Sequence, residues 1–329
     1  MTAPDRARAA AILLLLAGLA AVAVLVARSE MDGILRALTS LGLGGFALIV
    51  AVHLTVIVLM GIAWSQLGGV PMVGFIRARL LRDAAAEVLP LSQVGGFVLG
   101  GRALVLSGAN GAQASALTVV DITAELVAQM LYTIIGLAVL ADLHPQADIA
   151  MPARAAVAAL GGLLGGFVLV PLRGAKAAVR LVMRLARLLG IGGTDGPDHG
   201  AALTRELGTL HRATRTLVAC TLWHLAAWVL VGMETWLLCR LLGVPVGLGA
   251  ALVIDSLISG LRSVAFMVPQ ALGVQEGGYI MLGALFGLSA EAALALSLVR
   301  RARDLVIGLP ILLVWQVVEG RRSLRRGVT

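Results

Sequence analysis

The sequence predicts an all-α polytopic integral membrane protein with six transmembrane helices, two re-entrant hairpins broken by proline and glycine, and an inverted-topology repeat. Hydrophobic residues make up 59% of the 329-residue chain and charged residues only 13%, which is more apolar surface than a soluble domain can bury. Two hydrophobic stretches in opposite halves are interrupted at residues 89–96 and 268–278. Non-helical backbone at bilayer depth is tolerated only inside protein or beside a polar cavity, so these breaks indicate a substrate site near the midplane.

Six continuous apolar segments are long enough to cross the bilayer. The first, residues 9–27, has no charged residue and spans about 28 Å as a helix; because arginines precede it and similar segments follow, we expect a retained anchor. The other five are residues 41–67, 112–140, 154–170, 217–242 and about 296–318.

The two interrupted segments, residues 70–106 and 247–288, each have room for two short helices that meet at the break. If neither segment crosses the membrane, the arginine-rich segments all lie on one side, which the positive-inside rule makes cytoplasmic. Both termini are then cytoplasmic, the acidic loop 141–151 lies outside, and the two hairpins enter from opposite sides. This is the expected inverted topology.

A single membrane domain, residues 1–329, therefore divides into a first half (1–170), a basic cytoplasmic linker (171–215) and a second half (216–329). Aligning the halves at a shift of 182 residues matches Gly95 with Gly277 and Gly96 with Gly278, which favours a repeat. Basic and apolar residues alternate in the linker as on an amphipathic helix at a lipid surface. A solvated linker that only sets topology is the alternative, and neither interpretation implies nucleic-acid binding.

Charged side chains form a stripe on the third expected span. Polar residues spaced three and four apart share one helical face: Thr118, Asp121, Glu125, Gln129 and Tyr132. Each ionised residue at a helix centre costs roughly 2.5 to 3.5 kcal/mol, so these carboxylates need partners. The sixth span offers Ser297, Arg300, Arg301, Arg303 and Asp304.

We therefore expect the third and sixth spans to face each other. Asp121 or Glu125 would pair with Arg301 or Arg303, and Arg300 would pair with Asp304 one turn along its own helix. The alternative is a fixed ion-pair lock that joins the halves without touching substrate.

The breaks bring further polar residues to the expected midplane. Helices that begin after Gly96 and Gly278 would present free N–H groups to an anionic or polar headgroup. The candidate binding residues at the breaks are Ser92, Gln93, Gly95, Gly96 and Arg102 in the first half, and Gln275, Glu276, Gly277 and Gly278 in the second. Arg102 is equally compatible with an interfacial anchor, and Glu276 with a cap on nearby backbone amides.

Catalytic and cofactor motifs are lacking. The five histidines show no paired ligand spacing, and there is no phosphate-binding loop or hydrolase motif, so we expect neither a cofactor, a metal nor a catalytic residue. Cys220 and Cys239 lie too far apart in one expected helix to form a disulfide. His53, His224 and Glu234 are interpreted as helix-to-helix hydrogen bonds, with a proton relay through His224 and Glu234 as the alternative.

These motifs together resemble the family built on the transmembrane region of lysylphosphatidylglycerol synthase, and most closely its hopanoid-associated, HpnL-like branch. The resemblance spans nearly the whole chain. It rests on the motif around residues 89–96 with Arg102, on the stripe of Asp121 and Glu125, and above all on residues 273–278 followed by residues 297–304. Many relatives have an acidic residue where this chain has Phe97.

The resemblance implies a bacterial inner-membrane protein that translocates a lipid, either a hopanoid or an anionic or aminoacylated phospholipid, or that assists a lipid-modifying enzyme. It does not imply aminoacyl transfer, because in the family that activity belongs to an additional soluble domain and this sequence ends at Thr329 just after its sixth span. We expect membrane lipids as partners and no enzymatic activity. A non-transporting scaffold is the main alternative, and an intramembrane transferase with Asp121 or Glu125 as base is a third.

Overall fold

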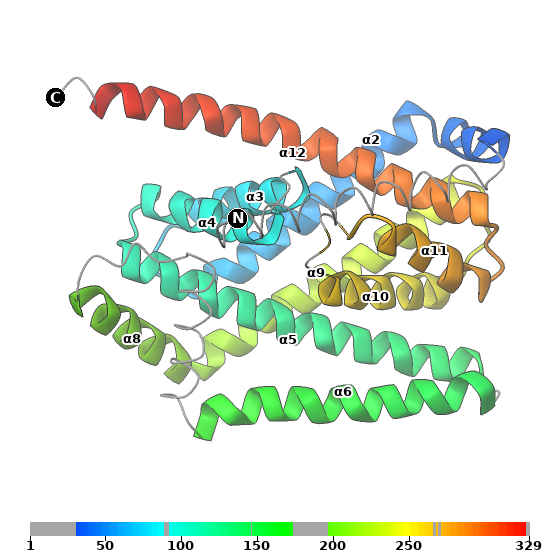
Figure 1. Cartoon of the computed structure of the whole chain (residues 1–329), viewed down its shortest axis with the longest axis horizontal. Coiled ribbons are helices and arrows are strands. Elements are labelled where there is room, and N and C mark those ends of the chain that lie inside the picture. The colour runs from blue at the N-terminus through cyan, green and yellow to red at the C-terminus, as the bar shows by residue number, and fades with distance from the viewer. Residues whose placement is uncertain are drawn as a thin grey trace, which may run out of the picture.

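The computed structural model describes residues 31–88, 92–145, 147–173, 197–265, 268 and 271–326, and these residues form ten helices and no strands (Figure 1). In chain order the helices are α2 (Met31–Ser65), α3 (Met72–Val88), α4 (Ser92–Leu106), α5 (Gly111–Leu143), α6 (Ala147–Arg173), α8 (Pro197–Arg212), α9 (Thr214–Leu241), α10 (Leu248–Val264), α11 (Val274–Ala284) and α12 (Ala290–Arg326).

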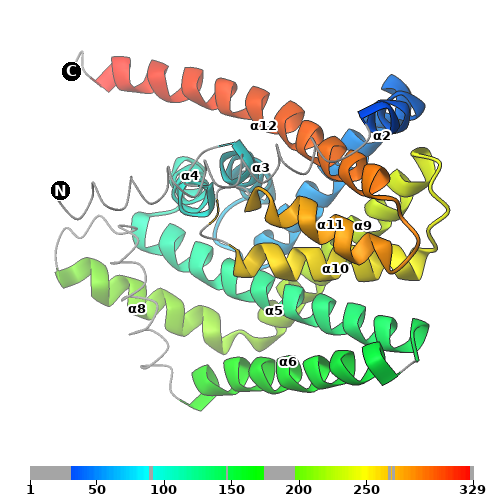
Figure 2. The same cartoon turned by 45° about the vertical axis from the view of Figure 1, so that its right-hand side comes forward.

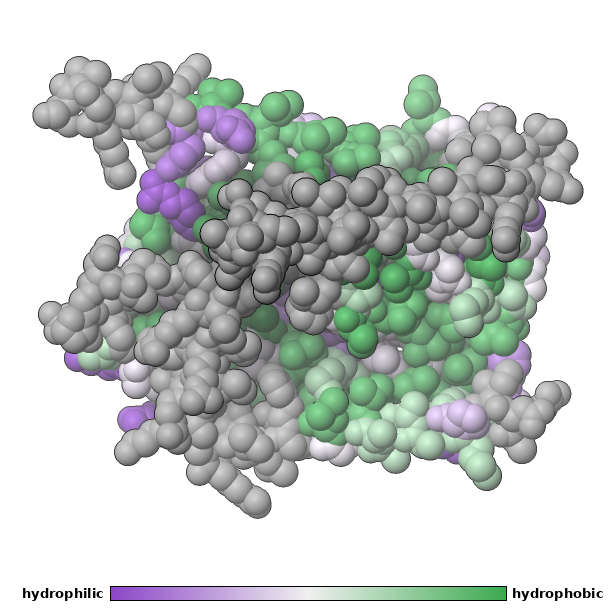
Figure 3. Space-filling model, viewed as in Figure 1, coloured by the Kyte–Doolittle hydropathy of each residue, from purple (hydrophilic) through white to green (hydrophobic). Residues whose placement is uncertain are grey.

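Three of the described helices are long and apolar enough to cross a membrane: Leu41–Ser65 within α2, all of α5 and all of α9. They match three of the six predicted spans. The fourth and sixth predicted spans lie within α6 and α12, and the first, residues 9–27, lies outside the described residues. Among the coloured residues in the middle of Figure 3 most are hydrophobic, and hydrophilic residues gather toward the left and right edges.

Each of the two predicted breaks lies between two short helices that form a pair. The first lies between α3 and α4, which pack against each other, and the second lies between α10 and α11, which do the same. The positive φ of Gly273 (78°), immediately before α11, is a conformation that glycine adopts without strain. The expected helix starts after Gly96 and Gly278 are wrong, because α4 already begins at Ser92 and α11 at Val274.

The two helix pairs lie toward opposite ends of the molecule, with α3 and α4 to the left and α10 and α11 to the right in Figure 1. Between them α2 packs against α9. The expectation that the third and sixth spans face each other is also wrong. Helix α5 packs on α9 and α10, α12 packs on α2 and α3, and α5 and α12 run along opposite sides of the molecule (Figures 1 and 2).

Glycine permits the closest of these helix contacts. A Cβ atom on Gly136 of α5 would lie 2.8 Å from the Cβ of Ser256 on α10, and a Cβ on Gly96 of α4 would lie 2.6 Å from the carbonyl oxygen of Arg82 on α3. Real Cβ atoms do not approach so closely. Gly96 thus has a packing role that accounts for its place in the motif.

The linker between the halves is partly described. Helix α8 lies within the predicted linker 171–215, begins at Pro197 and packs mainly on α5. Residues 174–196 of the linker lie outside the described residues.

Candidate functional site

A cavity of about 400 Å³ lies between the two helix pairs and is bounded by residues of both halves of the chain. Trp228, Phe97 and several aliphatic side chains form its apolar part. The charged residues in its lining are Arg79, Arg82, Asp83 and Glu87 on α3, Glu125 on α5, Arg262 on α10, and Arg300, Arg303 and Asp304 on α12. These side chains belong to two networks of ion pairs and to one bridge between the helix pairs.

The first network, called here the α3–α5 cluster, consists of Arg79, Arg82, Asp83, Asp121, Glu125 and His224. Arg79 donates two hydrogen bonds to Glu125, at 2.9 and 2.8 Å, and a third to Asp83 at 2.8 Å. Arg82 donates to Asp121 at 2.7 Å and to Glu125 at 2.6 Å. The two guanidinium groups therefore satisfy both intramembrane carboxylates of α5.

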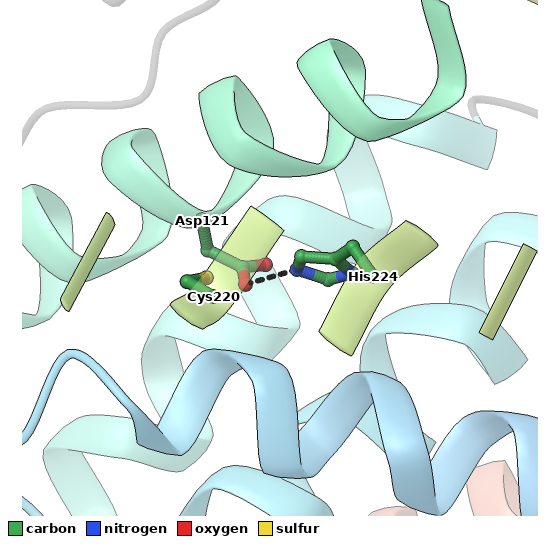
Figure 4. Close-up of side chains that lie close together, drawn as sticks. All are labelled: Asp121, Cys220 and His224. Atoms are coloured by element: carbon green, nitrogen blue, oxygen red, sulfur yellow. Dashed lines mark hydrogen bonds and ion pairs between the residues drawn. The ribbon is translucent and has the colours of Figure 1, made fainter. Parts of the chain in front are cut away.

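Asp121 is fully buried and has a second partner across the helix interface. The Nε2 atom of His224 on α9, also fully buried, lies 2.9 Å from Asp121 Oδ1 (Figure 4). Arg82, the other partner of Asp121, also contacts an aromatic ring. Its guanidinium carbon lies 4.8 Å from the ring centre of Phe97, close enough for a cation–π contact. Phe97 therefore contacts the cationic side chain of Arg82.

The pairing that the sequence analysis expects for Asp121 and Glu125 is wrong. Their partners are Arg79 and Arg82, not Arg301 or Arg303. The positive-inside rule assigned Arg79 and Arg82 to the membrane surface, whereas both are buried. The two arginines are three residues apart on α3 and the two carboxylates are four apart on α5, so each pair lies on one face of its helix. This matching spacing is the sequence pattern that could have predicted the pairing.

The second network, the α12 cluster, consists of Arg300, Arg303, Asp304, Asp255, Glu234 and His53. Arg300 donates to Asp255 at 2.5 Å and to the hydroxyl of Thr235 at 2.6 Å. The Tyr132 hydroxyl donates to Asp255 from α5 at 3.2 Å. Arg300 is therefore committed to α9 and α10, and its expected pairing with Asp304 along α12 does not form.

Arg303 and His53 share the same two carboxylates. Arg303 donates to Glu234 through Nη1 and to Asp304 through Nε at 2.9 Å and Nη2 at 2.6 Å. His53 Nδ1 lies 2.9 Å from Glu234, and His53 Nε2 lies 3.9 Å from Asp304. The helix-to-helix hydrogen bond expected of His53 is confirmed. His224 and Glu234, grouped as a relay alternative, belong to different clusters.

Residues of the second break join α11 to α12. Gln275 donates to the hydroxyl of Ser297 at 2.8 Å, Ser297 donates to Glu276 at 3.0 Å, and Arg301 donates to Glu276 at 2.7 Å. Glu276 also accepts from the backbone N–H of Gly273 at 2.8 Å, so the capping alternative is confirmed. Neither Arg301 nor Glu276 is among the cavity-lining residues.

The other predicted residues have varied positions. Gly278 is buried on α11 against α10 side chains, whereas a Cβ on Gly277 would have open space. Ser92 and Gln93 form the first turn of α4, with Gly95 half-buried one turn later. Arg102, farther along α4, donates to Glu319 of α12 at 2.7 Å.

Hydrogen bonds also join α10 to α5 and to α3. Gln129 of α5 donates to the carbonyl oxygen of Ser259 at 2.8 Å and to the hydroxyl of Ser263 at 2.6 Å. Arg262 donates to both oxygens of Glu87 at 2.8 and 3.1 Å. The Glu87–Arg262 bridge joins the last turn of α3 to the last turn of α10, where the two helix pairs approach each other.

Three buried side chains of the α3–α5 region have metal-binding types: Asp121, Cys220 and His224, whose ligand atoms lie within 4.8 Å of one another (Figure 4). Cys220 and His224 are four apart on α9, a spacing that the search for paired histidines overlooks. Asp121 is already held by Arg82 and His224, and a divalent cation would face the charge of that guanidinium. We therefore assign Asp121 and His224 to the ion-pair network.

Five of the predicted binding residues line the cavity: Glu125, Gln129, Arg300, Arg303 and Asp304. His53 is predicted only to form a helix-to-helix hydrogen bond, Arg79 and Arg82 belong to the arginine-rich segments predicted on the cytoplasmic side, and Glu87 has no predicted role. Arg262 bridges to Glu87 across 175 residues of sequence, so no local pattern could have revealed the pairing.

Comparison with known proteins gives one match. A family model described as the lysylphosphatidylglycerol synthase TM region matches residues 10–311. This match does not identify the hopanoid-associated branch. Neither a curated protein nor a solved structure matches this chain.

Proposed function

Because the chain belongs to the family of the lysylphosphatidylglycerol synthase transmembrane region, we propose that it is a lipid translocase, which moves an amphipathic lipid between the two leaflets of the membrane. The family is membrane-associated and lipid-related. The observation that carries the proposal is the charged cavity between the two broken helix pairs. A lipid headgroup needs such a polar environment to cross the hydrocarbon core, whereas its tails need none.

The proposed membrane arrangement has six crossings and two re-entrant helix pairs. The packing supports an inverted repeat, because α5 packs on α9 and α10 as α12 packs on α2 and α3. In this arrangement α3 and α4 enter from the cytoplasm and α10 and α11 from outside. The remaining features of the proposal are both termini in the cytoplasm, a bacterial inner-membrane location, and residues 171–215 as a basic linker at the lipid surface.

The headgroup would first meet the Glu87–Arg262 bridge. Among the ion pairs whose members line the cavity, this pair is the most exposed, with 28% and 25% of the side chains accessible. A phosphate can replace Glu87 as the partner of Arg262 through a bidentate contact. The more deeply buried arginines of the two clusters would then offer further contacts as the helix pairs separate.

The proposed substrate is a hopanoid or an anionic or aminoacylated phospholipid. The hopanoid choice depends on the likeness of residues 273–278 and 297–304 to the hopanoid-associated branch, and the phospholipid choice depends on the five arginines of the cavity. No chemical step is assigned to the protein itself.

Leaflet exchange of labelled hopanoid and phospholipid analogues in proteoliposomes tests the proposal. We expect wild-type protein to speed exchange and Arg262→Ala to slow it about tenfold or more, because a charge-assisted contact contributes about 1.5 to 3 kcal/mol. The matched control is Arg240→Ala, which removes an exposed arginine that stacks on Trp236 at the end of α9. Equal rates for the two variants would contradict a headgroup role for Arg262.

The second candidate function is a non-transporting scaffold for a lipid-modifying enzyme. One observation favours it: each arginine in the cavity lining already has a carboxylate partner, as a fixed lock would require. Folded wild-type protein that exchanges none of the lipids would support the scaffold. An intramembrane transferase is less well supported, because the carboxylates of Asp121 and Glu125 are both already paired with guanidinium groups.

A further inference from the structure

Each charge cluster receives its histidine from the other half of the chain. His224 of α9 belongs to the α3–α5 cluster, and His53 of α2 belongs to the α12 cluster. Both clusters contain three carboxylates and two guanidinium groups, so each carries one net negative charge when its histidine is neutral. The histidine is the one member of each cluster whose side chain type can change its charge near neutral pH.

Only one of the two histidines is among the cavity-lining residues. His53 has 18% of its side chain accessible and lies in the lining, whereas His224 is fully buried behind Asp121. Histidine is the side chain type that changes charge between pH 5 and 8. His53 is therefore the group that can exchange a proton with the cavity.

The surroundings of His53 connect its protonation to the arginine next to it. Glu234 of α9 faces its Nδ1 and Asp304 of α12 faces its Nε2, and Arg303 of α12 holds both of these carboxylates. Arg303 itself lines the cavity. If Arg303 turns to a phosphate, Glu234 and Asp304 lose a cationic partner, and a protonated His53 is the group placed to supply one.

We propose that His53 is a proton-binding site of the translocation cycle and that one proton accompanies each anionic headgroup. The inference rests on the proposed lipid translocase. A proton from the aqueous side binds the imidazole as phosphate takes Arg303 from Glu234 and Asp304, and it leaves when Arg303 returns. The negative charge of the headgroup thus enters together with a positive charge. Anion binding and proton binding must then strengthen each other by the same factor.

The test uses the whole protein in vesicles that contain a labelled anionic phospholipid and a pH-sensitive dye in the lumen. Exchange is measured first at equal pH on both sides, which tests translocation alone. A pH gradient of one unit is then imposed. We expect wild-type protein to enrich the label in one leaflet, up to tenfold for one proton per lipid, and to move protons only when the anionic lipid is present.

His53→Gln should slow exchange of the anionic lipid already at equal pH, because no proton can then compensate Glu234 and Asp304 when Arg303 leaves them. Whatever exchange remains should show neither gradient-driven enrichment nor lipid-dependent proton movement. His144→Gln, which changes a histidine at the end of α5 outside both clusters, is the matched control and should behave as wild type. Wild-type exchange without gradient-driven enrichment, or enrichment that survives His53→Gln, overturns the proton site and leaves the translocase standing. If the wild-type protein shows no exchange at equal pH, both the proton site and the translocase are overturned.

A second measurement covers the case in which His53→Gln does not fold. Wild-type protein in weakly buffered detergent receives a short-chain anionic phospholipid, and the protons taken up are counted near pH 7. Uptake that a short-chain neutral lipid does not cause supports the inference. Anionic lipid that binds without proton uptake overturns it.

Discussion

Arg82 shows how a single residue can unite elements that are distant in the sequence. Its guanidinium donates to Asp121 and Glu125 on α5 and lies over Phe97 on α4, while its backbone carbonyl lies against Gly96. Asp121 in turn contacts His224 on α9. Removing one member of such a network leaves a charge without a partner in a site where water cannot replace it.

Asp121→Asn should therefore lower the free energy of unfolding by about 3 to 5 kcal/mol, because it leaves Arg82 with one fewer carboxylate. Unfolding in mixed detergent micelles would measure the loss. Asp142→Asn, an exposed position near the end of the same helix, is the control and should change little. Adding Arg82→Gln to Asp121→Asn should recover part of the loss, and strictly additive losses would contradict the pairing.

At the level of helices, close contact depends on residues without side chains. Helices α5 and α10 approach each other where Gly136 meets Ser256, and Gln129 of α5 reaches two α10 residues one to two turns away. Separating these helices would also move Tyr132 away from Asp255. The spacing of α5 and α10 therefore controls the geometry of the α12 cluster.

Gly136→Ala tests this spacing. Its new Cβ would lie 2.8 Å from the Cβ of Ser256, so we expect a loss of about 1 to 3 kcal/mol of stability from overpacking. Gly161→Ala on α6 is the matched control, since nothing lies within 4 Å of its Cβ position and alanine favours a helix by up to about 1 kcal/mol. Thermal unfolding of both variants measures the change in stability. A gain for Gly136→Ala would argue against close helix contact.

Several helices could be predicted from the sequence, whereas the partners of the charged side chains could not. Pro90 and Pro269 mark interruptions that need no tertiary information, and α2, α5 and α9 are long apolar segments, so the short helix pairs and three spans were predicted. The partners of the charges were not. Arg79 and Arg82 have the local pattern of a membrane-surface segment, and only the packing of α3 inside the bundle reveals their burial.

At the scale of the whole molecule, the two halves meet around one cavity and are bridged there by Glu87 and Arg262. Because these residues lie at the inner ends of α3 and α10, any separation of the helix pairs must break this bridge. A lipid headgroup that passes between the pairs therefore needs the bridge to open.

Cross-linking this position tests the proposed opening. Cysteines at 87 and 262, joined by a short reducible thiol reagent in a background with Cys220 and Cys239 changed to alanine, should stop leaflet exchange. Reductant should restore exchange to the rate of the unlinked double-cysteine variant, which is itself slow because it lacks Arg262. Cross-linked protein that exchanges lipid as fast as the unlinked variant would show that the helix pairs need not separate.

The crosswise placement of the histidines has a consequence for biosynthesis. His53 is made 181 residues before its partner Glu234, a delay of about 10 to 40 s at ordinary translation rates. During that time α2 and the α3–α5 helices are in the membrane without the chain that completes their charge networks. Each half, made alone, holds the arginines and carboxylates of one cluster but lacks the histidine that completes it.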